Sequence, residues 1–255
     1  MEELFRDLNM YVSNEFEEMV MDRLNRRAAG EPAAYLTGEW EFYGIPLKIT
    51  PGVLIPRNDT ELLAEKAIEL ARLKDEPIRV LDLCCGSGCI GIAIAQNAAH
   101  CRVTMADKSP DALRLSKYNV NMNNLSRNIK CISVDALEPP PRLMGTYDLI
   151  VSNPPYIPTA DIDTLDVSVK GFEPKMALDG GRDGLSFYRS IIGYWRNALK
   201  DHGIMMLEVG INQAETVKKM MRTVGFKNVC SIKDTQDIPR VVLGIKMEQA
   251  DENEE

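Results

Sequence analysis

The chain has 255 residues, which is enough for one large α/β domain with a small appendage. Its hydrophobic content of 45% is that of a globular protein, and no apolar run approaches the ~20 residues that span a membrane. The net charge of −8 argues against broad capture of nucleic acid, which needs lysine and arginine to neutralise phosphates. The acidic N-terminus lacks the pattern of a signal peptide, so we expect a cytoplasmic protein without membrane contact.

The six cysteines and two histidines do not indicate a metal site. The cysteines form no Cys-x-x-Cys pair, and their spacing matches no zinc pattern. We therefore expect reduced thiols that fill apolar space, and we predict no bound metal.

Residues 1–55 predict an N-terminal segment made of a helix and a β-hairpin. The helix ends before Gly30, and its apolar residues share one face: Phe16, Met19, Val20 and Leu24. We expect that face to dock on the main domain. Aromatic and β-branched residues around Gly44 then predict the hairpin.

Residues 56–247 alternate between helices and buried strands. The predicted strands are 78–83, 102–107, 129–135, 147–152, 203–209, 226–232 and 241–247. The predicted helices are 60–72, 86–97, 110–123, 185–199 and 213–224, and residues 157–184 are predicted to be loop-like. This order predicts an α/β fold with a seven-stranded, mostly parallel sheet and a C-terminal antiparallel pair. Residues 248–255 form a predicted acidic, disordered tail.

A Gly-rich turn joins the first of these strands to its helix. It comprises Asp82, Leu83, Cys84, Cys85, Gly86, Ser87 and Gly88. Glycines there let a ligand approach the backbone, and the helix N-terminus offers free N–H groups. The spacing Gly86-x-Gly88-x-x-Gly91 also fits the dinucleotide fingerprint, although that match alone is weak.

Acidic residues end the next two strands. Asp107 is placed to accept hydrogen bonds from ribose hydroxyls, which suits NAD and S-adenosylmethionine alike. The alternative is an ordinary helix cap before Ser109. Asp135 ends the third strand, where its neighbours would border an adenine ring, and here a purely structural role is equally compatible with the sequence.

The fourth strand runs directly into Asn153-Pro154-Pro155-Tyr156. Two prolines there forbid a continued ladder and an immediate helix, so the backbone is stiff and its carbonyls lack strand partners. An amide, a free carbonyl and an aromatic ring at one strand end suit a planar group that carries an NH2. The alternative is a Pro-rich turn that leaves the sheet. Together with the Gly-rich turn, this stretch favours methyl transfer to an sp² nitrogen over hydride transfer, because no histidine lies near a strand's C-terminal end.

From about residue 26 to residue 247 the chain resembles the HemK/PrmC family, which methylates the side-chain amide nitrogen of a glutamine in peptide chain release factors. The Asn-Pro-Pro-Tyr stretch alone is shared with adenine amino-group methyltransferases, whereas the full set of motifs is specific to this family. The matching motifs are Arg27-x-x-Gly30-Glu31-Pro32-x-x-Tyr35-Leu36-x-Gly38, Val53-Leu54-Ile55-Pro56-Arg57-x-Asp59-Thr60-Glu61, Asp82 to Gly88, Asn153 to Tyr156, Glu173-Pro174-x-x-Ala177-Leu178-x-Gly180-Gly181-x-Asp183-Gly184-Leu185, and Leu207-Glu208-x-Gly210-x-x-Gln213.

The resemblance implies a Rossmann-like class I methyltransferase domain over 56–247, with S-adenosylmethionine as cofactor and release factors as protein substrates. The implied cofactor contacts are Asp82, Cys84, Cys85, Gly86, Ser87, Gly88, Asp107, Asp135, Ala136 and Asn153. Asn153, Pro154, Pro155 and Tyr156 form the implied glutamine site, with Asn153, Pro154 and Tyr156 acting in catalysis. We expect a monomer that does not bind nucleic acid directly.

The sequence departs from the family pattern at two places. Cys84 replaces the usual first glycine of the cofactor loop, and we expect it to keep φ below zero, where a Cβ is tolerated. The family also has a helical N-terminal domain that helps to hold the release factor, and only about 30 residues precede the matching region here.

Three alternatives remain open from the sequence. The first is an amino-group methyltransferase for adenine or another nucleic-acid base, using the same Asn-Pro-Pro-Tyr site. The second is a nicotinamide oxidoreductase, which only the glycine fingerprint supports. The third is a non-catalytic binding module that keeps the fold.

Overall fold

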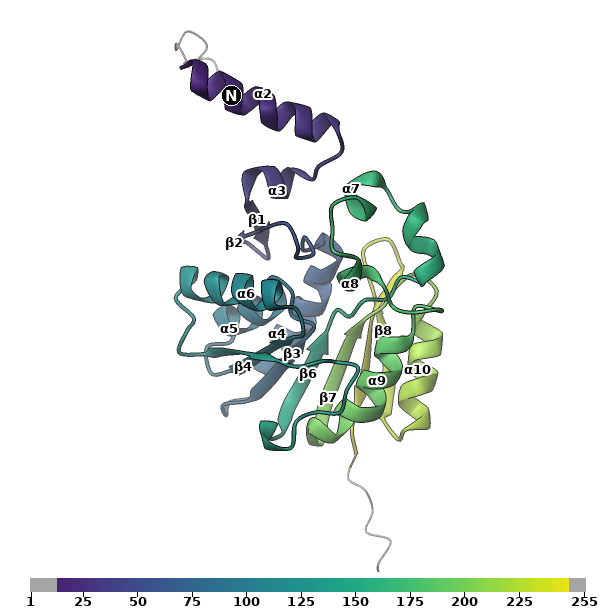
Figure 1. Cartoon of the computed structure of the whole chain (residues 1–255). Helices are drawn as coiled ribbons and strands as arrows, with labels where there is room; N and C mark the ends of the chain where they lie inside the picture. The colour runs from purple at the N-terminus through teal and green to yellow at the C-terminus, as the bar shows by residue number, and fades with distance from the viewer. Residues whose placement is uncertain (1–12, 248–255) are drawn as a thin grey trace, which may run out of the picture.

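The computed structural model describes residues 13–247 and places a seven-stranded sheet at the centre of the protein (Figure 1). The strands are β3 (Arg79–Leu83), β4 (Arg102–Asp107), β5 (Ile129–Ser133), β6 (Tyr147–Ser152), β7 (Leu199–Glu208), β8 (Lys227–Lys233) and β9 (Pro239–Ile245). Their order is β5-β4-β3-β6-β7-β9-β8. The first five are parallel, and β9 runs antiparallel to both β7 and β8. The predicted mostly parallel sheet with a C-terminal antiparallel pair is confirmed.

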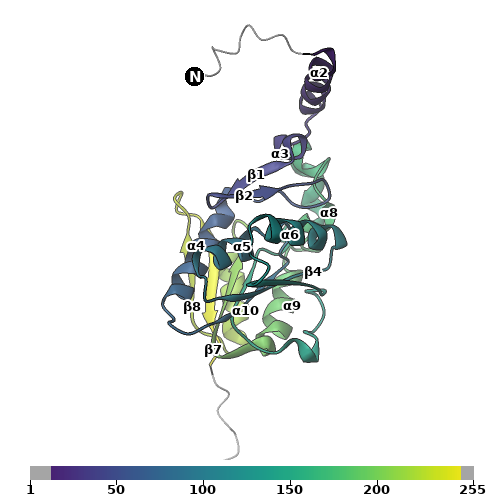
Figure 2. The ribbon, with the colours of Figure 1, turned by 90° about the vertical axis from the view of Figure 1, so that its left-hand side faces the viewer.

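Helices cover both faces of this sheet because its central strands are apolar on both sides. In β3, Val80 belongs to the core beneath α4 (Glu61–Arg72) and α5 (Cys89–Asn97), and Leu81 belongs to the core on the other face. The second core packs against α9 (Ser186–Tyr194) and α10 (Ala214–Thr223), and both views in Figures 1 and 2 show these two layers. Helix α6 (Pro110–Met122) lies on the same side as α4 and α5. No helix within residues 13–247 is long and apolar enough to cross a membrane.

The strand order reverses direction between β3 and β6, and this reversal positions the functional site. Leu83 pairs with Ser152 at the carboxyl ends of the two strands. The Gly-rich turn and the Asn-Pro-Pro-Tyr stretch therefore leave the sheet side by side, at the point where open α/β sheets bind ligands.

The predicted hairpin is present and packs onto the main domain. Strands β1 (Glu39–Phe42) and β2 (Ile45–Lys48) join through Tyr43 and Gly44, both at positive φ, as tight hairpin turns require. Phe42, Ile45 and Leu47 are buried in the same core as α4 and α5. In α6, the side-chain amide of Asn119 accepts a hydrogen bond from the Lys48 N–H and donates one to the Lys48 carbonyl. The short helix α3 (Ala33–Thr37) precedes the hairpin.

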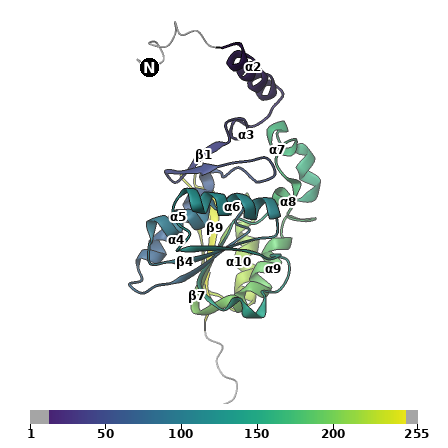
Figure 3. The same ribbon diagram turned by 60° about the vertical axis from the view of Figure 1, so that its left-hand side comes forward.

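The N-terminal helix does not dock on the main domain, so that prediction is wrong. Helix α2 (Asn14–Ala28) has no buried residue, and Figures 1 and 3 show it projecting away from the sheet. Phe16 and Leu24 are 49% and 55% exposed. Helical periodicity identifies an apolar face but does not say which element covers it. The predicted N-terminal residues 1–12 and the tail 248–255 lie outside the described residues.

The region 157–184 contains more secondary structure than the predicted loop. It includes the 3₁₀ helix η3 (Thr159–Thr164) and the short helices α7 (Val167–Lys170) and α8 (Lys175–Leu178). A parallel bridge joins Ile157 to Asp179. These helices are too short for a periodic apolar pattern to mark them in the sequence. The remaining 3₁₀ helices are η1 (Asn58–Thr60), η2 (Arg142–Met144) and η4 (Trp195–Ala198).

Candidate functional site

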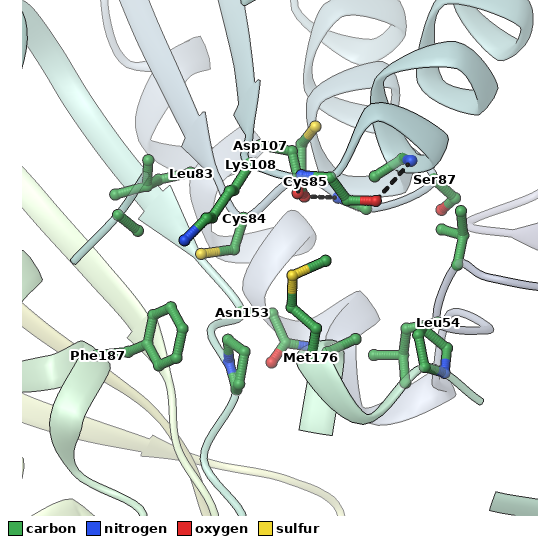
Figure 4. A pocket seen from close by; sticks show the side chains of 18 of the residues that line it. Leu54, Leu83, Cys84, Cys85, Ser87, Asp107, Lys108, Asn153, Met176 and Phe187 are labelled. Atoms are coloured by element: carbon green, nitrogen blue, oxygen red, sulfur yellow. Dashed lines mark hydrogen bonds between the residues drawn. The ribbon is translucent and has the colours of Figure 1, made fainter. Parts of the chain in front are cut away.

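A cavity of about 450 Å³ opens at the carboxyl ends of β3, β4, β5 and β6 (Figure 4). One side is made by the turn after β3 and by the residues that follow β4 and β5. The other side is made by Gly52–Arg57, by Asn153 and Pro155 after β6, and by residues between Thr159 and Phe187. The cavity therefore lies where the sequence predicted a cofactor beside an acceptor group.

The turn after β3 presents Cys84, Cys85, Gly86 and Ser87 to the cavity. The Cys85 N–H donates to the Ala106 carbonyl over 3.1 Å, which ties the turn to β4. Gly88 lies behind the cavity wall at a φ of 87° and is the N-cap residue of α5, which begins at Cys89. This φ is strained for any residue with a Cβ, and a Cβ there would also come within 2.9 Å of the end of the Met105 side chain, so glycine is favoured.

Cys84 has a φ of 61°, so the prediction that it keeps φ below zero is wrong. An L-residue in the left-handed region costs roughly 1–2 kcal/mol relative to glycine. The next residue, Cys85, is held on β4 by the hydrogen bond from its N–H to the Ala106 carbonyl. The Cys84 side chain packs against the core on the α9 side of the sheet, and this burial offsets part of the backbone strain.

Asp107, the last residue of β4, holds the turn and still faces the cavity. Its Oδ2 accepts a hydrogen bond of 2.9 Å from the Gly86 N–H, and its Oδ1 accepts one of 2.8 Å from the Ser109 N–H. Burial raises the pKa of Asp107, and these backbone donors oppose the rise. Each carboxylate oxygen has a second lone pair, so Asp107 can also accept hydrogen bonds from ribose hydroxyls.

Asp82 lies beneath the turn and does not line the cavity. It is fully buried in β3, and its Oδ2 accepts a 2.9 Å hydrogen bond from the Gly91 N–H at the start of α5. Burial raises its pKa to about 7. The geometry gives Asp82 a role in supporting the turn from below.

Asp135 and Ala136 follow β5 and line the cavity. The Asp135 carboxylate pairs with Lys108 over 2.6 Å and accepts a hydrogen bond from the Leu137 N–H. The Ala136 carbonyl accepts hydrogen bonds from Ser190 and from the Trp195 indole. Both residues are thus fixed at the edge of the cavity, on the same side as Asp107.

Asn153 has a defined orientation in the cavity wall. Its Nδ2 donates a 3.1 Å hydrogen bond to Thr60 Oγ1, and no group of residues 13–247 donates to its Oδ1. The preceding residue is anchored too, because Ser152 Oγ donates to the Leu83 carbonyl over 2.6 Å. Asn153 therefore offers a free acceptor beside the cofactor side of the cavity.

Pro154 and Tyr156 lie next to the cavity without lining it, whereas Pro155 lines it. Gln213 fixes this stretch: its Nε2 donates to the Tyr156 carbonyl over 2.9 Å and to the Gly184 carbonyl over 3.3 Å. Its Oε1 accepts hydrogen bonds from the Gly210 N–H and the Tyr188 hydroxyl. A Cβ on Gly184 would collide with the Tyr156 carbonyl oxygen, so this glycine permits the close approach.

An ion pair closes the opposite side of the cavity. Arg57, which lines the cavity, contacts the buried Glu173 carboxylate over 2.6 Å. This pair joins the segment before η1 to the segment before α8, which brings Met176 into the cavity wall.

The site residues that the sequence reasoning missed include Thr60, Arg57, Met176 and Phe187, all of which line the cavity. Thr60 and Arg57 fall within one of the family motifs, which was the available signal. Met176 occupies an unspecified position of another family motif, and Phe187 follows the end of that motif by two residues, so neither position was marked as facing the cavity.

The fold of the chain is similar to that of known methyltransferases. Residues 60–168 match the family model of the methyltransferase small domain. A methyltransferase from Pyrococcus furiosus aligns with a TM-score of 0.59 at 17% identity, over 89% of this chain and 99% of its own. A ribosomal protein L11 methylase from Lactobacillus delbrueckii subsp. bulgaricus aligns with a TM-score of 0.55 at 19% identity, over 80% of this chain and 86% of its own. These matches show that the chain has the Rossmann-like fold of class I methyltransferases.

Sequence relatives narrow this class. The release factor glutamine methyltransferase of Geobacter sulfurreducens is 42% identical over 86% of this chain and 75% of its own length. The enzyme of the same name from Clostridium acetobutylicum is 40% identical over 88% of this chain and 79% of its own. The chain belongs to the release factor glutamine methyltransferase family, which confirms the family expected from the sequence motifs.

Proposed function

We propose that this protein transfers a methyl group from S-adenosylmethionine to the side-chain amide nitrogen of the glutamine in the Gly-Gly-Gln motif of peptide chain release factors. The observation that carries the proposal is the orientation of Asn153. Its Nδ2 is held by Thr60, which leaves Oδ1 as an acceptor in the same cavity as Asp107. An acceptor at this point matches the NH2 group of a glutamine amide.

The cofactor fits the other side of the cavity. We propose that the backbone of Cys84 to Gly88, the Asp107 carboxylate, and Asp135 with Ala136 hold S-adenosylmethionine, with Asp82 supporting the turn from beneath. The unused lone pairs of Asp107 suit ribose hydroxyls, and the volume of about 450 Å³ lies within the range of small-ligand sites. When bound, the cofactor supplies an electrophilic methyl group.

The residues of the chain act mainly by alignment. An amide nitrogen is a weak nucleophile because its lone pair is delocalised. Asn153 Oδ1 accepts one N–H bond from the glutamine amide, and we propose that the carbonyl of Pro154, which borders the cavity without lining it, accepts the other. Two acceptors fix the direction of the nitrogen. As positive charge develops on that nitrogen, both acceptors bind its hydrogens more strongly, and this lowers the barrier.

Tyr156 supports the amide without removing a proton. Burial raises the pKa of Tyr156 to about 12, so its phenol stays neutral at physiological pH. We propose that its ring packs against the plane of the glutamine amide. As the N–C bond forms, the bond between the methyl group and the donor sulfur breaks, and the nitrogen then loses one proton to solvent water.

A labelled-methyl assay tests this function. Purified release factor should accept the label, and the same factor with its motif glutamine replaced by alanine should not. DNA and RNA serve as parallel acceptors, because the Asn-Pro-Pro-Tyr site also suits an adenine amino group. Label on nucleic acid, or equal labelling of the glutamine-free factor, would refute the proposal.

We also propose that the enzyme is cytoplasmic, because release factors act on ribosomes. We further propose that it is a monomer.

A further inference from the structure

Glu208, the last residue of β7, is a buried carboxylate without an evident structural partner. Its exposed fraction is 3%, and within residues 13–247 its Oε2 has no hydrogen-bond partner. Burying a carboxylate without full hydrogen bonding costs several kcal/mol in folding free energy, so such a group calls for a functional explanation. Glu208 lies behind the cavity wall and does not line the cavity.

The side chains in front of Glu208 are those that orient the proposed acceptor site. Thr60 and Asn153 are polar side chains beside this carboxylate, and both act to lower the Glu208 pKa, against the effect of burial. Thr60 is 2% exposed, and its Oγ1 accepts the Asn153 Nδ2–H. A hydroxyl has one hydrogen to donate and two lone pairs. Since Asn153 donates to one lone pair of Thr60, the hydroxyl hydrogen remains available to the carboxylate.

We propose that Glu208 is a positioning residue that, through Thr60, holds the Asn153 amide with Nδ2 inward and Oδ1 toward the cavity. The inference rests on the proposed function, in which Asn153 Oδ1 accepts from the substrate. An ionised carboxylate only accepts hydrogen bonds, so Thr60 must donate to it and can only accept from Asn153. If the hydrogen bonds from Asn153 through Thr60 to Glu208 ran in the opposite direction, Asn153 would present its own NH2 to the NH2 of the substrate. Two donors would then face each other.

Charged and titratable groups on every adjoining element act on Glu208. They are Asp59 of η1, Arg240 of β9, Tyr156 after β6, Tyr188 of α9 and Cys89 of α5. Burial, reinforced by Asp59, raises the pKa of Glu208 to about 7, while Thr60, Arg240 and Asn153 oppose the rise. As pH falls through 7, the carboxyl gains a proton that it can donate to Thr60. The direction of the hydrogen bonds from Asn153 through Thr60 to Glu208 is then no longer fixed, so kcat should fall as the pH drops below 7.

The first test replaces the carboxylate with its isosteric amide. We expect Glu208→Gln to lower kcat for release factor methylation at pH 8 by about tenfold to a hundredfold, because a misaligned acceptor costs rate on this scale. The dissociation constant for S-adenosylhomocysteine should stay within about twofold, since Glu208 does not line the cavity in which we place the cofactor. The acid-side fall of kcat near pH 7 should be present in the wild type and absent in the variant.

The second test addresses Thr60, so that a fold defect in the first variant leaves the inference testable. Thr60→Val keeps the shape but removes the hydroxyl, and we expect it to lower kcat about as much as Glu208→Gln. Thr60→Ser restores the hydroxyl and should recover most of that loss. Thermal melting of all three variants identifies any change in stability.

The outcomes separate this inference from the proposed function. If the wild type does not methylate release factor, the proposed function fails. If the wild type is active while Glu208→Gln keeps the wild-type kcat and pH profile, only the role of Glu208 is refuted. Equal losses in Thr60→Val and Thr60→Ser would also refute it, because they would show that bulk and not the hydroxyl matters.

Discussion

The two sides of the cavity are built in different ways. The cofactor half, formed by the turn Cys84–Gly88 with Asp107, Asp135 and Ala136, is closed by contacts between neighbouring strand ends. The Gly86 N–H reaches Asp107 across 21 residues of sequence. The acceptor half, formed by Asn153–Tyr156 with Thr60, Glu208 and Gln213, is closed by distant contacts. Asn153 bonds Thr60 across 93 residues, and Gln213 bonds Tyr156 across 57.

This difference separates binding from turnover. The cofactor half uses backbone geometry, which few side chains can disturb without altering the turn. The acceptor half uses side-chain amides and hydroxyls whose direction depends on partners elsewhere in the fold. Changes in the first half should therefore weaken cofactor binding, and changes in the second half should slow methyl transfer.

The largest effect is expected at Asn153. Asn153→Ala removes the acceptor for the substrate amide and should lower kcat by ~10²-fold or more, the order seen when one aligned polar partner is lost. Steady-state methylation of release factor measures this loss. Calorimetric titration of S-adenosylhomocysteine provides the control: because Asn153 also borders the cofactor, some affinity can be lost, but that loss should be much smaller than the loss in kcat. Turnover near the wild-type rate would contradict the assignment of the acceptor half.

The next effect is on stability, at Gln213. Gln213→Leu leaves the Tyr156 carbonyl, the Gly184 carbonyl and the Gly210 N–H without their amide partner. The free energy of unfolding should fall by about 2 kcal/mol, as expected for unsatisfied buried groups. Denaturant titration checks this value, with Gln236→Leu as the matched control in the exposed β8–β9 turn. Equal stability of the two variants would show that Gln213 does not hold the acceptor half.

A smaller effect, confined to binding, is expected at Asp107. In the wild type, the Asp107 carboxylate accepts hydrogen bonds from two backbone N–H groups. In Asp107→Asn, the new NH2 group faces one of these two donors and cannot accept from it. The affinity for S-adenosylmethionine should fall about tenfold, the cost of losing one good hydrogen bond. Asp75→Asn, in the exposed turn after α4, is the control for the change of charge. A loss in kcat at saturating cofactor, with unchanged affinity for S-adenosylmethionine, would contradict the claim that the cofactor half governs binding and the acceptor half governs turnover.

The smallest effect concerns the backbone of Cys84. Cys84→Gly and Cys84→Ala both lose the thiol, so their comparison isolates the cost of positive φ. The glycine variant should be more stable than the alanine variant by about 1 kcal/mol. Thermal melts of the pair measure the difference. The opposite order would mean that residue 84 keeps an ordinary negative φ.

The same contrast explains what the sequence could predict. The strands, the Gly-rich turn and Asp107 are local signals, because a buried strand, a glycine and a strand-ending acid follow each other in order. The motifs also singled out Thr60, Glu208 and Gln213, but they gave no reason for these residues to meet Asn153, since only the fold brings them together. The exposed face of α2 and the positive φ of Cys84 were mispredicted because both depend on surroundings that periodicity does not encode.

The most direct measurement of the central claim is a crystal structure with S-adenosylhomocysteine and a peptide that carries Gly-Gly-Gln. We predict that the glutamine side chain enters the cavity and that its amide nitrogen lies within hydrogen-bond distance of Asn153 Oδ1, beside the sulfur of the cofactor product. A glutamine side chain bound outside the cavity, or one whose amide nitrogen points away from Asn153, would contradict the account.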